Sequence, residues 1–163
     1  MKRRTKEEAR AIGQKEIDRI LSQFGKPSIP LKITADRLGA PTNLAVCRFF
    51  LGKPFVIIFR PRHAMHLELI DFIDIIRHEV AHSIAGFNAG HGSAFQEVCK
   101  QIKCVAEKCI KEDYVKIAFS KYTYTCINCG REIYKTRKVR VNHSCGECSR
   151  SYNPKYLLKL KEV

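Results

Sequence analysis

The 163-residue chain has no apolar stretch that approaches the length of a membrane-spanning helix; its longest uninterrupted one is Phe55–Phe59. Its first eight residues are mostly charged and lack the apolar segment of a secretory signal peptide. Internal repeats and low-complexity segments are also absent. These absences predict a protein with no membrane partner that remains inside the cell, in the cytoplasm or nucleoid, or in the nucleus of a eukaryote.

Acidic residues are few. The chain has 16 acidic against 30 basic residues, a formal net charge of +14, and residues 121–163 hold ten basic and three acidic residues. A strongly basic protein is predisposed to bind polyanions, above all nucleic acid. The alternative interpretation is a general surplus of solubilising charge, but the concentration of charge in the last quarter of the chain favours a binding surface there.

Helical and extended patterns alternate along the chain, which predicts an α+β fold. Thr5 and Glu8 match a capping box that opens a helix ending near Phe24. Residues 43–60 predict a β-hairpin with its turn at 52–54. Helical periodicity follows over about residues 66–86. A second capping box at Ser93 predicts a further helix that runs to about residue 111. We therefore expect one domain over 1–120 and a small second one over 121–163.

The helix predicted over 66–86 carries the sequence His78-Glu79-Val80-Ala81-His82. Residues four apart lie on one face of a helix, so the two imidazoles can bind one tetrahedral zinc ion. Glu79 lies next to the first of them, placed to take a proton from a water molecule at the metal. A surface helix that carries two histidines by chance is the alternative, but this helix is otherwise apolar, and buried imidazoles and carboxylates are costly unless they are paired or bound to metal.

Catalytic zinc usually has three protein ligands and an open position. His91, between Gly90 and Gly92, is the predicted third ligand, and Glu97 in the following helix is the competing candidate. His63 and His66 are expected at the surface or behind the ligands, and Asp71 or Asp74 could orient an imidazole.

Eight cysteines in an intracellular protein indicate metal binding or buried thiols instead of disulfides. Four of the cysteines form two pairs, each with two residues between its members, and fifteen residues separate the pairs: Cys126, Cys129, Cys145 and Cys148. This pattern is typical of a structural zinc site with four thiolate ligands. We expect the remaining cysteines, Cys47, Cys99, Cys104 and Cys109, to be small buried residues. Two zinc ions per chain, one catalytic and one structural, are therefore predicted.

The histidine-glutamate motif, the later His91-Gly92-Ser93-Ala94-Phe95 segment and the basic four-cysteine region together resemble the SprT-like family, which includes the Spartan proteases. The resemblance covers about residues 10–160. It implies a zincin-like metalloprotease domain followed by a zinc ribbon, with His78, His82 and His91 as zinc ligands and Glu79 as the catalytic base. It also implies a zinc-dependent endopeptidase that acts on proteins bound or crosslinked to DNA, in DNA–protein crosslink repair.

Basic residues between the two cysteine pairs are the predicted nucleic-acid contacts: Lys135, Arg137, Lys138 and Arg140. Five of the six tyrosines follow residue 120, and cations beside aromatic rings suit single-stranded or unpaired DNA. The tyrosines could equally form the small core of the ribbon. Two other functions stay open: a regulatory peptidase that cleaves one specific protein partner, and a non-catalytic, zinc-dependent nucleic-acid-binding protein.

Overall fold

The structure, a computed structural model, describes residues 4–36, 38–39, 43–106, 120–139 and 142–161. They form a mixed α+β protein with two small sheets, divided into two compact units at residues 114/115. No helix among the described residues has the length and apolar character needed to cross a membrane.

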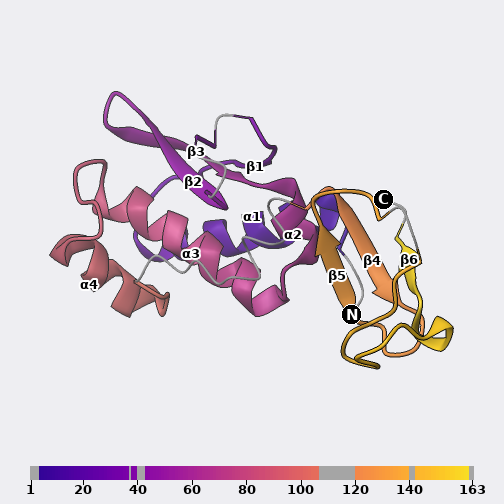
Figure 1. Cartoon of the computed structure of the whole chain (residues 1–163). Coiled ribbons are helices and arrows are strands. Elements are labelled where there is room, and N and C mark those ends of the chain that lie inside the picture. The colour runs from indigo at the N-terminus through magenta and orange to yellow at the C-terminus, as the bar shows by residue number, and fades with distance from the viewer. Residues whose placement is uncertain (1–3, 37, 40–42, 107–119, 140–141, 162–163) are drawn as a thin grey trace. The chain divides into compact units, whose positions relative to one another are not determined.

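In its described residues, the first unit combines four helices with one sheet (Figure 1): α1 (Lys6–Gln23), β1 (Leu31–Ile33), β2 (Ala45–Phe50), β3 (Lys53–Phe59), α2 (Pro61–His66), α3 (Leu69–Ala85) and α4 (Ser93–Ile102). The strand order is β1-β3-β2. β1 runs parallel to β3 and β2 runs antiparallel to it, so β2 is an edge strand of this sheet.

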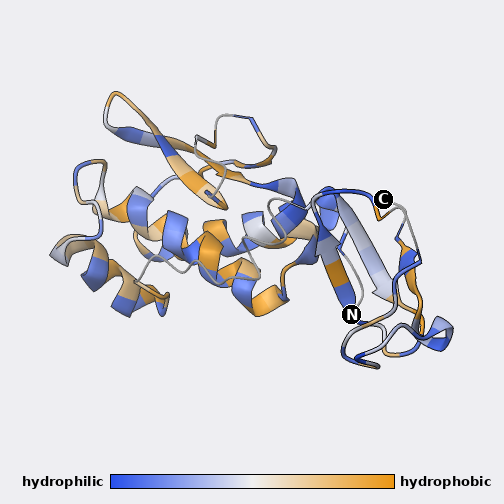
Figure 2. Ribbon diagram, viewed as in Figure 1, coloured by the Kyte–Doolittle hydropathy of each residue, from blue (hydrophilic) through white to orange (hydrophobic). Residues whose placement is uncertain are grey.

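The core of this unit lies between the sheet and the pair α1 and α3, and its apolar residues dominate α3 and the strands in Figure 2. Gly13 allows this close packing, because a Cβ atom there would lie 2.4 Å from Leu31 Cδ2 and 3.2 Å from Phe72 Cζ. The ring of Phe72 on α3 packs on Phe59 of β3 with centroids 4.9 Å apart. α3 is therefore held against the sheet at a fixed position.

The predicted hairpin is present, but its turn is tighter than expected. Leu51 and Gly52 form the turn with φ of 49° and 74°, whereas Lys53 and Pro54 belong to β3. Positive φ at both central residues is typical of the two-residue turns that match the twist of paired strands. Proline is tolerated in β3 because β1 pairs only with residues 57–59, which leaves that end of β3 with one neighbouring strand.

The helix boundaries confirm one prediction and correct two. The capping box of α1 is formed, with the Glu8 amide donating to Thr5 Oγ1 at 3.1 Å and the Thr5 amide to Glu8 Oε2 at 2.7 Å. Ser93 does not cap α4; Gly92 occupies the N-cap position and no side chain completes a capping bond. α4 also ends at Ile102 instead of near residue 111, because Lys103 adopts a left-handed conformation with φ of 54°.

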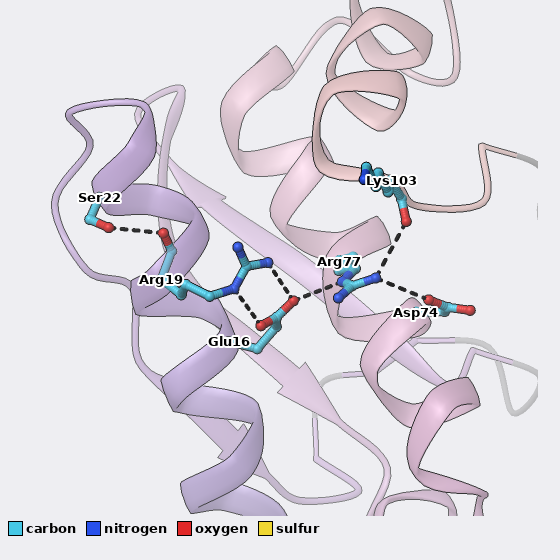
Figure 3. Close-up of polar contacts among 6 residues, drawn as sticks. All are labelled: Glu16, Arg19, Ser22, Asp74, Arg77 and Lys103. Atoms are coloured by element: carbon cyan, nitrogen blue, oxygen red, sulfur yellow. Dashed lines mark hydrogen bonds and ion pairs between the residues drawn. The ribbon is translucent and has the colours of Figure 1, made fainter.

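An ion-pair network joins α1 to α3 and to the segment after α4 (Figure 3). Glu16 accepts two bonds from Arg19, both at 2.8 Å, and one from Arg77 Nε at 2.7 Å. Arg77 also lies 3.7 Å from Asp74 and 3.4 Å from the carbonyl oxygen of Lys103. Arg77 immediately precedes His78, so this network fixes α3 where the first predicted ligand lies.

The second unit is a three-stranded antiparallel sheet with the order β5-β4-β6, formed by β4 (Tyr122–Cys126), β5 (Glu132–Lys135) and β6 (Leu158–Leu160). A short 3-10 helix, η1 (Pro154–Tyr156), precedes β6. The sheet is small, and its main buried residues are Thr123, Tyr124, Cys126 and Cys145.

Glu16→Gln should lower the free energy of unfolding by about 1 to 3 kcal/mol at pH 7, because hydrogen bonds to charged groups contribute roughly this much. The hydrogen bond from Arg19 holds the pKa of Glu16 below its ordinary value of 4.5. A group with a lowered pKa stabilises the fold fully above its unfolded-state pKa, so the difference between variant and wild type should shrink as the pH falls below 4.5 and be lost as it falls through the lower pKa of the folded state. Urea unfolding from pH 3 to 7 measures both effects.

Glu97→Gln is the matched control, since Glu97 is an exposed carboxylate on α4. Its unfolding curves should follow the wild type at every pH. A Glu16→Gln variant that is equally stable at pH 7, or whose deficit does not shrink between pH 7 and pH 3, would contradict the assigned role.

Candidate metal centres

Three imidazoles converge at one point of the first unit. His78 and His82 lie one turn apart on α3 with ring centroids 5.0 Å apart, and the ring of His91 lies 5.1 Å and 4.8 Å from them. One ring nitrogen of each lies within 4.8 Å of the others, so the group could hold a metal ion. Glu97, the competing third ligand, is not part of this group among the described residues.

The loop between α3 and α4 brings His91 back towards α3. Gly86 ends α3 with φ of 99°, a conformation that glycine adopts without strain. Successive tight turns follow, with the Ala89 amide donating to Gly86 O at 3.1 Å and the Gly92 amide to Ala89 O at 3.0 Å. The buried ring of Phe95 on α4 then packs against all three imidazoles at centroid distances of 5.0, 4.3 and 4.8 Å.

The hydrogen bond of His78 fixes which of its nitrogens faces the group. Its Nδ1 lies 3.1 Å from the carbonyl oxygen of Val105, which can only accept, so Nδ1 carries the proton and Nε2 presents its lone pair. Nε2 of His78 and Nε2 of His91 are 3.1 Å apart. Two nitrogens bound to one tetrahedral zinc ion would be separated by about 3.4 Å. The separation of these two nitrogens is therefore compatible with zinc.

Burial favours the neutral form of His78 and His82, which is the form that binds metal. Burial lowers the pKa of His78, with its bond to Val105 opposing and the neighbouring His91 adding to the shift. Burial, with smaller contributions from His78 and His91, lowers the pKa of His82 to about 4. A metal ion would therefore displace few protons from these two histidines at neutral pH.

Glu79 lies beside the histidines in sequence but is not one of the grouped ligands. It is buried, and its Oε2 accepts a hydrogen bond of 2.7 Å from the backbone N–H of Cys47 on β2. Burial raises its pKa to about 7, and the bond from Cys47 opposes that rise. A carboxyl group with such a pKa can take up and release a proton at neutral pH.

The second unit brings its four paired cysteines together. The sulfur atoms of Cys126, Cys129, Cys145 and Cys148 lie within 4.8 Å of one another, and the distances Cys126–Cys148 and Cys129–Cys145 are both 3.9 Å. Disulfide sulfurs would be about 2.05 Å apart, whereas two thiolates on a tetrahedral zinc ion would be about 3.8 Å apart. The four thiols could therefore hold a metal ion.

Each cysteine pair lies in a tight turn. Gly130, with φ of 71°, closes the first turn, and its amide donates to Cys126 O at 3.0 Å. The backbone N–H of Cys129 is the chief cause of a lowered pKa at Cys126, and hydrogen bonding to Cys129 raises the pKa of Cys148. The amides of the first turn thus favour the thiolate form of Cys126, which is the form that metals bind.

The predicted nucleic-acid contacts lie at the surface of the second unit. Lys135 at the end of β5, Arg137 and Lys138 are exposed, and Arg140 lies outside the described residues. Tyr124 is buried and its hydroxyl accepts from the Val139 amide at 2.9 Å, so this tyrosine belongs to the core of the unit. Tyr152, in contrast, is 60% exposed.

Sequence reasoning missed the Val105 carbonyl that orients His78. Asp74, one of the two candidates for that role, lies near Arg77 instead. A backbone carbonyl carries no residue-type signature, so only the path of the chain after α4 reveals it. Of the cysteines outside the two pairs, Cys47 and Cys99 are buried, Cys104 is half-buried, and Cys109 lies outside the described residues.

No protein-family model matches the chain, and neither a curated protein nor a solved structure matches it.

Two metal ions per chain should be found by elemental analysis of the purified protein. Replacing His78 and His82 with alanine should remove one ion, because two of its three ligands are lost, and replacing Cys126 and Cys129 with serine should remove the other. His143→Ala is the control: His143 is exposed and lies outside both groups, so both ions should remain. A folded wild-type protein with one ion or none would refute the two-site interpretation.

Proposed function

We propose that the chain is a zinc-dependent endopeptidase whose first unit is a zincin-like catalytic domain and whose second unit is a structural zinc ribbon. We further propose that it acts on proteins bound or crosslinked to DNA. The observation that carries the catalytic part is the convergence of three imidazoles next in sequence to a buried carboxyl group that a sheet-edge amide holds in place.

The two ligand sets favour different roles for the metal. Three histidines leave a fourth position of a tetrahedral ion open, as in catalytic zinc sites, whereas four thiolates close the coordination sphere. The half-exposed histidine group therefore suits chemistry, and the four-cysteine group suits stabilisation of a unit whose core is small.

Zinc held by His78, His82 and His91 would acidify a water molecule and polarise the carbonyl of the bond to be cut. Glu79 is then the proton carrier: its carboxylate accepts the proton of the attacking water and passes it to the nitrogen of the departing amine. The Cys47 amide occupies one oxygen of the carboxylate, which limits its rotation and leaves the other oxygen for the proton. The Val105 carbonyl holds the ring of His78 through Nδ1.

The position of β2 supports a polypeptide substrate. β2 is an edge strand of the described sheet, and its Cys47 amide contacts Glu79 directly. The Cys47 amide is occupied by Glu79, but an edge strand can bind an extended peptide through its remaining outward backbone groups. A peptide placed along this edge would have its backbone next to the base that the reaction needs.

The charge of the second unit supports association with DNA. Its exposed Lys135, Arg137 and Lys138 are among ten basic residues over 121–163, against three acidic ones. The same histidine group and buried carboxyl group would also serve a regulatory peptidase that cleaves one protein partner. Such a peptidase, however, has no need for the positive charge of the second unit. A purely structural role for the histidine group leaves the cost of burying Glu79 without a purpose.

Glu79→Gln should leave both metal ions in place and reduce cleavage of an unfolded protein substrate by about 10² to 10⁴, because loss of a general acid–base group typically costs this much. Glutamine keeps an oxygen to accept from Cys47 N–H but cannot carry the proton. Glu97→Gln is the matched control and should cleave like the wild type. Activity above a tenth of the wild type in Glu79→Gln would exclude the assigned role.

DNA should bind without sequence preference, and binding should weaken steeply as salt rises. Replacing Arg137 and Lys138 with alanine should reduce the slope of log affinity against log salt by about 0.7 to 0.9 for each phosphate that the variant no longer neutralises. It should also reduce any stimulation of cleavage by DNA while the four-cysteine metal remains. Lys15→Ala, an exposed lysine on α1, is the control. Wild-type affinity and slope in the double variant would place the DNA surface elsewhere, and cleavage that never responds to DNA would favour the regulatory peptidase.

A further inference from the structure

Large apolar side chains stand exposed at the free end of the β2–β3 hairpin and on the loop after α3. Phe50 is 68% exposed, Leu51 86%, Phe55 48% and Phe87 67%. Figure 2 shows the apolar character of the hairpin end. Together with Phe49, whose ring lies 5.5 Å from that of Phe87 in an edge-to-face arrangement, these residues form what we call the aromatic rim.

The backbone holds these side chains outward. The pairing of β2 with β3 shifts by one between Arg48 and Phe49, because β3 has one additional residue there, Phe55. Such a bulge bends a strand and re-aims its side chains, and bulges are frequent beside functional sites. At the turn, Leu51 has φ of 49°, where asparagine or glycine would be less strained. A strained and 86% exposed leucine contributes little to folding, which argues for another use.

The rim adjoins the histidine group along two separate paths of the chain. Phe49 lies two residues after Cys47, whose amide holds Glu79, and a strand advances about 3.3 Å per residue. Phe87 lies in the loop that connects His82 to His91. The rim therefore begins about two residues of extended chain away from the carboxylate.

We propose that the aromatic rim binds a large apolar side chain of an extended polypeptide substrate, within about two or three residues of the bond that is cut. This inference rests on the proposed function and adds to it a substrate preference. A peptide along the edge of β2 advances at the same rate as β2 itself, so a side chain two or three residues from the scissile bond reaches the rim. Folded proteins bury most such side chains, so the rim would select unfolded or flexible segments.

Two other occupants fit the rim less well. A stable homodimer interface usually uses about 20 to 30 residues on each side, and the rim has five. Nucleic-acid bases stack on open aromatic faces between cations, but Phe49 and Phe87 meet edge to face at 64°, and the most exposed member, Leu51, is aliphatic.

The test uses quenched fluorescent peptides of glycine, serine and lysine in which one phenylalanine occupies each position in turn. The zinc-loaded wild type should cleave with a kcat/KM at least tenfold higher when phenylalanine lies within three residues of the cut than when serine takes its place, since one apolar contact is worth roughly 10- to 200-fold. The ratio should fall towards one in Phe50→Ser/Phe87→Ser and be reduced in Leu51→Asn, a change that suits the positive φ.

Ile70→Ser is the matched control. Ile70 is 71% exposed on the first turn of α3 and is not part of the rim, so this variant should keep the wild-type ratio. Unchanged ratios in both rim variants would overturn the inference and leave the peptidase proposal intact. The rim substitutions could instead abolish a monomer–dimer equilibrium seen in sedimentation velocity, or oligonucleotide binding, without changing the phenylalanine-to-serine ratio of kcat/KM. That outcome would also overturn the inference.

Binding to the zinc-loaded Glu79→Gln protein, followed by fluorescence anisotropy, separates the two proposals. If the phenylalanine peptides bind at least tenfold more tightly than the serine peptide and only the rim substitutions remove that preference, the rim is an apolar peptide site. That result together with no cleavage by the wild type would reject the peptidase and keep the rim. Cleavage without any preference for the phenylalanine peptides would reject the rim as a substrate site and keep the peptidase.

Discussion

The contact between the Glu79 carboxylate and the Cys47 amide is the constraint on which the first unit depends. A carboxyl group is costly to bury without a hydrogen-bond partner, so α3 must dock where an edge of the sheet offers a free N–H. Only an edge strand has one, and β2 is such a strand. The same docking sets the rotation of α3, which turns His78 and His82 towards the loop that carries His91. One hydrogen bond thus links the hairpin, the helix and the ligand group.

The two candidate metal centres differ in what the surrounding chain supplies. The histidine group is built on α3, which packs into a core of buried aromatic and aliphatic residues such as Phe59 and Phe72. The four-cysteine group belongs to a unit with few buried residues, so a metal ion there would replace a core that the chain is too short to build. A metal ion at the first group would therefore be added to a fold that already has a core, whereas a metal ion at the second would supply much of the stability of its unit.

Local patterns made part of this arrangement predictable. Spacing of four along a helix brought His78 and His82 together, and the capping box of α1 is set by neighbours in sequence. The short strand β1, the end of α4 at Lys103 and the Val105 carbonyl behind His78 depend on tertiary packing, which local residue patterns do not encode. Ser93 shows the limit most clearly: it matches a capping box, yet the chain enters α4 through Gly92 because the turns that place His91 end there.

The electrostatics of the histidine group suggest how the first unit tolerates ionisable side chains beside its core. Burial raises the pKa of Glu79 to about 7 and lowers that of His82 to about 4, so before metal binds His82 is uncharged at neutral pH and Glu79 is only about half ionised. Less charge then has to be buried during folding than if both groups kept their ordinary pKa values. A divalent cation would favour the ionised carboxylate and lower the pKa of Glu79 again, so Glu79 would gain its full charge as the cation arrives. The second unit buries few residues, so without a metal ion at its four thiols it has little core to hold it folded. Folding of the first unit can therefore precede metal binding, whereas folding of the second is coupled to it.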